Sequence, residues 1–117
     1  MALEIKEKKD GEINIVELYG ELDSSSVSVF NLRFKEITDK YGLGKYVLDM
    51  KSLIFISSAG WSAFVNECKR LRKSGGDLKL AVMQKDAERV YDLIGINSVI
   101  ESYKTAKDAV ESYAASR

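Results

Sequence analysis

Histidine and proline are absent from this chain of 117 residues, and Cys68 is its single cysteine. Without histidine, the Ser-His-Asp and Cys-His arrangements of many hydrolases cannot form, and the commonest metal-binding side chain is missing. One cysteine can neither close a disulfide within the chain nor build a zinc site on its own. We therefore expect a protein that is not an enzyme, with no catalytic residue, metal site or cofactor.

An excess of charge of one sign is also lacking, because eighteen basic and eighteen acidic side chains cancel to a net charge of zero. A balanced chain provides no long-range field that would attract nucleic acid or an anionic membrane. No apolar run approaches the roughly 20 residues of a membrane span. The charged and alternating first residues do not resemble a signal peptide. We expect a cytoplasmic protein that binds neither nucleic acid nor membrane.

The spacing of apolar residues changes between the period of a strand and that of a helix along the chain. Residues 3–9 and 13–19 alternate on either side of Asp10-Gly11, which predicts an antiparallel hairpin. Helical spacing follows at residues 27–41, and again from Trp61 to Leu71. Two shorter helices are expected, one beginning at Asp86 and one opened by Thr105 and Asp108, and strands are expected at residues 46–50, 53–56, 78–83 and 96–100.

Strands that alternate with helices in this order predict crossover connections and parallel strand pairs. The expected fold class is therefore α/β, with a mixed, mostly parallel sheet that is opened by an N-terminal antiparallel hairpin, and with about four helices. We expect residues 1–117 to form a single domain. Loops at the carboxyl ends of the strands are where such sheets usually meet ligands and partners, which draws attention to Asp23-Ser24 and Ser57-Ser58.

Residues 53–61 combine a strand end, a polar turn and the start of a helix. Leu53 to Ile56 is a continuous apolar run, which predicts the end of a buried strand. Ser57 and Ser58 interrupt that run before helical spacing begins. A serine in this place lies at a helix N-terminus, where backbone N–H groups lack partners and the helix dipole is positive.

Two interpretations of this serine pair remain open at this point, and both can hold at once. A serine hydroxyl that accepts a hydrogen bond from the first turn would cap the helix. Alternatively, one hydroxyl is exposed for modification, and an added phosphate would be stabilised by the helix end. The small side chains of Ala59 and Gly60 favour the second interpretation, because they would let another protein approach closely.

Two motifs together resemble a known family. The segment Gly20-Glu21-Leu22-Asp23 follows a predicted strand, and Phe55-Ile56-Ser57-Ser58-Ala59-Gly60 opens a predicted helix some 35 residues later. In this order the two segments resemble the STAS domain, and the length resembles that of a single-domain bacterial anti-sigma factor antagonist. The resemblance implies partner switching, in which an anti-sigma factor that is also a serine kinase phosphorylates the antagonist. A phosphatase of the PP2C type then restores the form that binds the kinase and frees the sigma factor.

Carried onto this chain, the resemblance implies that Ser58 is the phosphorylated residue. The family usually has aspartate where this chain has Ser57, so either serine remains a possible acceptor, with Ser58 nearer the helix end. Trp61 stands where a smaller aliphatic residue is usual, and its spacing fits an exposed contact anchor and a core residue equally well. The expected partner-binding residues are Asp23, Ser24, Ser57, Ala59, Gly60 and Trp61.

Two other functions compete with the phosphorylation switch. In one, the chain is a permanently docked structural STAS subunit of a larger assembly, such as a stressosome-like scaffold or the ATPase of a lipid transporter. In the other, Ser58 is the nucleophile of an enzyme. The second is disfavoured because the chain offers no histidine base and no evident Ser-Lys pair.

Overall fold

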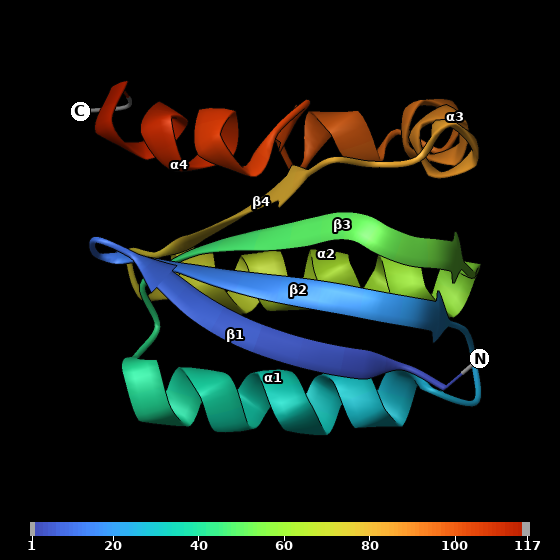
Figure 1. Cartoon of the computed structure of the whole chain (residues 1–117), viewed down its shortest axis with the longest axis horizontal. Coiled ribbons are helices and arrows are strands. Elements are labelled where there is room, and N and C mark those ends of the chain that lie inside the picture. Colours follow the sequence, from blue (N-terminus) through green and yellow to red (C-terminus); the bar gives the residue numbers. More distant parts are fainter. Residues whose placement is uncertain (1, 116–117) are drawn as a thin grey trace.

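The computed structural model describes residues 2–115. Five strands form one sheet in the order β1-β2-β3-β4-β5, with β1 and β2 antiparallel and the other neighbours parallel (Figure 1). The predicted mixed sheet, its N-terminal hairpin and the four helices are confirmed for these residues. The elements are β1 (Glu4–Asp10), β2 (Ile13–Leu22), α1 (Val27–Tyr41), β3 (Lys45–Ile56), α2 (Ser58–Lys73), β4 (Asp77–Ala81), α3 (Lys85–Leu93), the 3-10 helix η1 (Ile96–Ser98), β5 (Ser102–Tyr103) and α4 (Ala106–Ala115).

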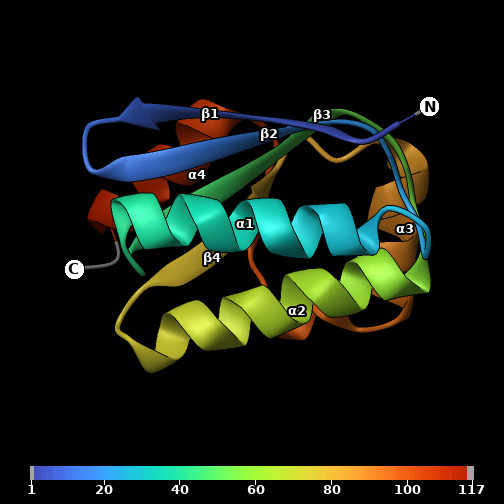
Figure 2. The same ribbon diagram turned by 90° about the horizontal axis from the view of Figure 1, so that it is seen from below.

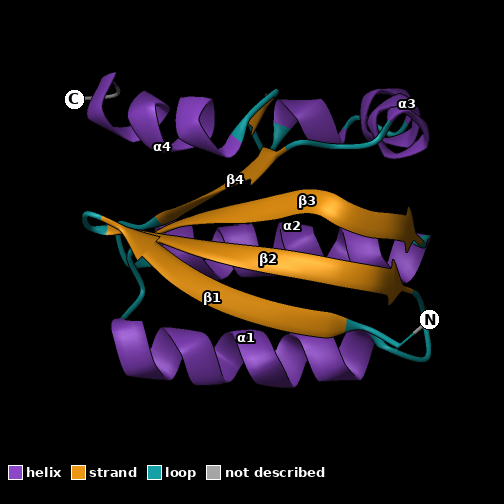
Figure 3. Ribbon diagram, viewed as in Figure 1, coloured by secondary structure: helices purple, strands orange, loops and turns teal. Residues whose placement is uncertain are grey.

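The two faces of the sheet are covered unequally. Helices α1 and α2 lie side by side on one face (Figure 2), and the core beneath them includes the buried rings of Phe30, Phe34 and Phe64. On the opposite face α4 covers a smaller cluster, in which Ala109 and Tyr113 pack on strand residues. Helix α3 lies beyond β4, beside the carboxyl end of β3 (Figures 1 and 3). The strands β2 and β3 therefore end in a region that α1, α2 and α3 border but do not enclose.

The segments predicted as two strands, residues 46–50 and 53–56, are a single strand, β3. Lys51-Ser52 does not interrupt it, because shifts in the register between β2 and β3 absorb the extra residues as bulges. The prediction that this strand ends in the core is wrong for Ile54 and Phe55, which are 54% and 51% exposed. Within β3, only Lys45–Asp49 pairs with β4, so the rest of β3 extends beyond β4.

The strand predicted at residues 96–100 is also wrong. Ile96 begins the 3-10 helix η1, and Ile100 donates its backbone N–H to the Ile96 carbonyl at 2.9 Å. The side chains of Ile96 and Ile100 are both buried in the same core cluster. The apolar residues that predicted a strand at 96–100 therefore belong to a tight helical turn. The last strand, β5, lies two residues further on. Gln84 rather than Asp86 occupies the N-cap position of α3, and Asp86 lies in its first turn.

Candidate functional site at the head of helix α2

The polar turn between β3 and α2 is short and well defined. Ser57 is extended, with φ −88° and ψ 174°, and it occupies the N-cap position of α2. Its Oγ accepts a hydrogen bond from the backbone N–H of Gly60 at 3.4 Å, and its carbonyl accepts one from Trp61 at 3.0 Å. Ser57 therefore performs the capping role that sequence reasoning allowed for either serine.

Ser58 is the first residue of α2 and is exposed. Within residues 2–115, its hydroxyl makes no hydrogen bond to another protein group. Helix α2 is 16 residues long and has no acidic residue in its first turn, so its positive end is not neutralised locally. Each interpretation of the serine pair therefore applies to a different residue: Ser57 caps the helix, and Ser58 has the exposed hydroxyl.

The Asp23 loop lies next to this turn because a hydrogen bond joins the two segments. The backbone N–H of Ser57 donates to the carbonyl of Leu22 at 2.9 Å, which places Asp23 beside the start of α2. Ser24 lies in the same loop and is exposed. The structure therefore brings the predicted residues of the two motifs together at one end of the sheet.

The Asp23 carboxylate is held by its own loop. Its Oδ1 accepts hydrogen bonds from the Ser25 hydroxyl at 2.7 Å and from the backbone N–H groups of Ser25 and Ser26 at 3.0 and 3.1 Å. The hydrogen bond from the Ser25 hydroxyl is the largest cause that lowers the pKa of Asp23; burial opposes it, and the weaker hydrogen bonds from the Ser25 N–H and from Ser26 add to the lowering. Asp23 is therefore a fixed negative charge at the site.

Trp61 is not an exposed contact residue, and its place among the predicted partner-binding residues is wrong. Its side chain is only 1% exposed and packs on Phe64 and Tyr91, with ring centroids 5.8 and 6.0 Å away. Because Tyr91 belongs to α3, the indole joins the first turn of α2 to α3. Trp61 follows the core periodicity of α2, which is the alternative that its spacing left open.

Gly60 also has a different role from the predicted one. It is buried, and a Cβ added to it would lie 2.7 Å from Cγ1 of Ile56 and 2.9 Å from Cγ of Leu22. The missing side chain therefore lets α2 begin close to β2 and β3. Ala59 beside it is half-buried.

Sequence reasoning missed Ile54 and Phe55 as surface residues of this site. The apolar run from Leu53 to Ile56 predicts a buried strand end. In the structure, however, Phe55 is half exposed, and it lies only three residues before Ser58. The exposure of this strand end could have been predicted from strand lengths, since the strand after α2 is much shorter than the segment from Lys45 to Ile56. A short neighbour leaves the end of a long strand uncovered.

No group of three or more acidic or cysteine side chains in residues 2–115 is placed to hold a metal ion. No helix in that part of the chain is long and apolar enough to cross a bilayer. Cys68 is buried, and burial raises the pKa of its thiol, so it is a packing residue.

Comparison with known proteins identifies the family of this chain. The model of the STAS domain family matches residues 4–109. The chain belongs to the STAS domain family. Two curated relatives of this STAS chain are the anti-sigma F factor antagonist of Paenibacillus polymyxa, 24% identical over 94% of each chain, and the anti-sigma-B factor antagonist of Bacillus subtilis (strain 168), 25% identical over 89% of this chain and 91% of the relative.

Solved structures show the same fold. The crystal structure of a candidate anti-sigma factor antagonist from Thermotoga maritima is 25% identical to this STAS chain. It superposes with a TM-score of 0.84 and covers 92% of both chains. The similarity therefore extends over nearly the whole sheet and its helices.

Proposed function

We propose that this STAS protein is an anti-sigma factor antagonist whose binding to an anti-sigma factor serine kinase is controlled by phosphorylation of Ser58. The unphosphorylated form binds the kinase and releases a sigma factor. The kinase phosphorylates Ser58, and a PP2C-type phosphatase returns the protein to its binding form. The observation that carries the proposal is the exposed Ser58 hydroxyl, free of intramolecular hydrogen bonds, at the positive end of α2.

Ser57 and Ser58 differ in how much phosphorylation would disturb the hydrogen bonds at the start of α2. Phosphorylation of Ser57 would turn the Oγ that accepts the hydrogen bond from Gly60 into a bridging ester oxygen, which is a weaker acceptor, and would therefore disturb the cap of α2. Phosphorylation of Ser58 breaks no such bond, and the unpaired backbone N–H groups of the first turn can stabilise the added charge. This favours Ser58 as the acceptor, with the fold unchanged in both states.

A phosphate on Ser58 acts through the surface that it alters. It adds close to two negative charges beside the fixed carboxylate of Asp23, which is connected to this turn through Leu22 and Ser57. A partner that packs closely against this surface would have to bury charge without a counter-charge. A cost of about 4 kcal/mol lowers the affinity roughly a thousandfold, which is enough to decide between partners.

The proposed role is binding and includes no catalytic step by this chain. The relatives named above are regulators that antagonise anti-sigma factors. Because a sigma factor acts on the transcription machinery, the proposed cycle operates in the cytoplasm. The protein itself is the substrate of the kinase and of the phosphatase.

The test measures the affinity of the protein for purified anti-sigma factor kinases from the same genome. Ser58→Ala keeps the affinity of the unmodified protein, and Ser58→Asp weakens binding by about a hundredfold or more because it places a charge in the contact. Ser74→Asp is the matched control, since Ser74 is an exposed serine at the other end of α2 and the substitution leaves binding unchanged.

Three results would overturn the proposal: equal affinity of Ser58→Ala and Ser58→Asp, equal loss with Ser74→Asp, or no binding to any of the kinases. A stable stoichiometric complex that is indifferent to Ser58→Asp would instead support the structural-subunit function.

A further inference from the structure

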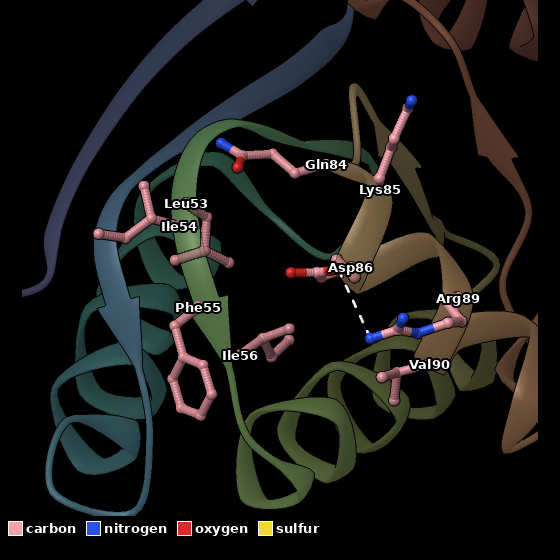
Figure 4. Close-up of a pocket in the computed structure, with 10 residues that line it drawn as sticks. Leu53, Ile54, Phe55, Ile56, Gln84, Lys85, Asp86, Arg89 and Val90 are labelled. Carbon is pink, nitrogen blue, oxygen red and sulfur yellow. Dashed lines mark ion pairs between the residues drawn. The ribbon is translucent and has the colours of Figure 1, made fainter.

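The carboxyl end of β3 overhangs the sheet on the side of α3. Beyond Asp49 the strand has no neighbour on this side, because β4 ends at Ala81. Gln84 connects α3 to the overhang by donating its Nε2–H to the Lys51 carbonyl at 3.0 Å. Between the overhang and α3 lies an open hollow of about 430 Å³ (Figure 4).

Apolar side chains continue from this hollow onto the surface beside Ser58. Ile56 and Val90 point toward each other across the hollow, while Ile54 and Phe55 lie at its far rim and point away from α3 (Figure 4). Ile54 and Phe55 are about half exposed, although large apolar side chains are usually buried. We call Ile54, Phe55, Ile56 and Val90 the apolar strip.

Charged side chains of α3 border the strip. Asp86 and Arg89 form an ion pair at 3.5 Å, but the two side chains are 93% and 74% exposed, so solvent screens the pair and its contribution is small. Lys85 adds a second cation to the lining (Figure 4). Among the residues that line the hollow, two cations and one carboxylate give the border a net charge of +1, while Glu88 and Asp92 of α3 lie outside this lining.

We propose that the apolar strip and its α3 border bind a segment of the anti-sigma factor kinase in which an apolar side chain is flanked by carboxylates. This inference rests on the proposed function and adds a second contact region beside Ser58. The apolar side chain enters the hollow between Ile56 and Val90, and the segment that carries it continues over the rim of the hollow to contact Phe55. The flanking carboxylates pair with Arg89 and Lys85, and Asp86 competes with them for Arg89.

The charge of the border favours this occupant over a second copy of the chain. In a two-fold dimer through the apolar strip, each border would meet the other, and both have a net positive charge. An acidic flank on the partner instead complements the border and steers the encounter. Self-association is therefore an outcome that the experiment must exclude.

The first experiment truncates the strip and measures affinity for the purified kinase that binds the unmodified protein. Phe55→Ala weakens binding by about tenfold or more, and Phe55→Asp weakens it further, because an apolar anchor at an interface is lost. Leu32→Ala and Leu32→Asp are matched controls, since Leu32 is a 64% exposed apolar residue on α1 outside the strip. They leave the affinity unchanged.

The second experiment tests the sign of the charge effect. Arg89→Gln weakens binding severalfold, whereas Asp86→Asn strengthens it about two- to threefold because Arg89 is released for the partner. Both effects shrink as the salt concentration rises. A merely structural role of the Asp86–Arg89 pair predicts the same direction for both variants, and opposite directions therefore separate the two explanations.

The outcomes distinguish this inference from the function on which it rests. If Ser58→Asp abolishes kinase binding while the Phe55 variants bind like the unmodified protein, the second contact region is wrong and the proposed function stands. The inference is also overturned if Asp86→Asn weakens binding, or if light scattering shows a dimer that Phe55→Asp dissociates. If no kinase binds the unmodified protein, both proposals fail.

Discussion

The Asp23–Ser26 loop and the Ser57-Ser58 turn look alike in sequence but hold their hydroxyl groups differently. Each follows a strand and precedes a helix, and each is rich in serine. In the first loop the hydroxyls of Ser25 and Ser26 are both hydrogen-bonded to Asp23, whereas the exposed Ser24 hydroxyl, which precedes the helix, makes no hydrogen bond within residues 2–115. In the second turn only the Ser57 hydroxyl is used, which leaves Ser58 free for a partner or a kinase.

The two segments also differ in how they are fixed. Hydrogen bonds to one carboxylate order the Asp23 loop, whereas close packing of Gly60 and Trp61 against the core holds the start of α2. A rigid, packed turn can present an exposed hydroxyl without using that hydroxyl for its own stability. Residue type alone therefore does not identify a modification site. Hydrogen bonding narrows the choice to the exposed Ser24 and Ser58, and of these only Ser58 lies within the first turn of a helix.

The largest expected effect comes from removing the packing that holds the start of α2. Trp61→Ala lowers the free energy of unfolding by about 3–5 kcal/mol, because a buried aromatic side chain leaves a cavity. Denaturant unfolding followed by circular dichroism measures the loss. Phe55→Ala is the control, since this half-exposed ring contributes less than about 1 kcal/mol to stability. Equal losses in the two variants would mean that Trp61 is not a core residue.

A smaller effect separates the two adjacent serines. Ser57→Ala lowers the free energy of unfolding by about 1 kcal/mol, because α2 loses its N-cap acceptor. Ser58→Ala changes it by less than about 0.5 kcal/mol, as expected for an exposed side chain without a partner. The same denaturant titration compares the two variants. A larger loss for Ser58→Ala would reverse the roles assigned to the two hydroxyls.

The smallest effect is a pH dependence of the Asp23 loop. Hydrogen bonds lower the pKa of Asp23 in the folded protein, so its ionised form stabilises the fold above the ordinary aspartate pKa. This contribution is lost as the pH falls through the lowered pKa. Thermal unfolding should show the unmodified protein more stable than Asp23→Asn at neutral pH, with the difference disappearing in acid. A constant difference would mean that the charge of Asp23 does not contribute.

Much of the fold follows from local patterns. The spacing of apolar residues predicts the hairpin and helices α1 and α2, and Thr105 caps α4 through the Asp108 N–H as expected. The errors arose where neighbours in space decide the outcome. Ile96 and Ile100 suit a strand as well as a turn, and only their packing in the core selects η1.

The site was predicted in part for the same reason. The two motifs placed Asp23 and Ser58 at one edge, because strand ends and helix starts are readable from spacing. The exposure of Phe55 depends on the length of β4, and the burial of Trp61 depends on Tyr91 of α3. Neither the spacing of residues along the sequence nor their type shows whether Phe55 is exposed or Trp61 is buried.

The most direct test of the central claim is to find which hydroxyl receives phosphate. The unmodified protein, Ser57→Ala and Ser58→Ala are each incubated with ATP and the anti-sigma factor kinase that binds the protein, and the modified residue is mapped by mass spectrometry. The account predicts phosphate on Ser58 in the first two proteins and none in Ser58→Ala. Phosphate on Ser57, or on a serine of the Asp23 loop, would contradict it.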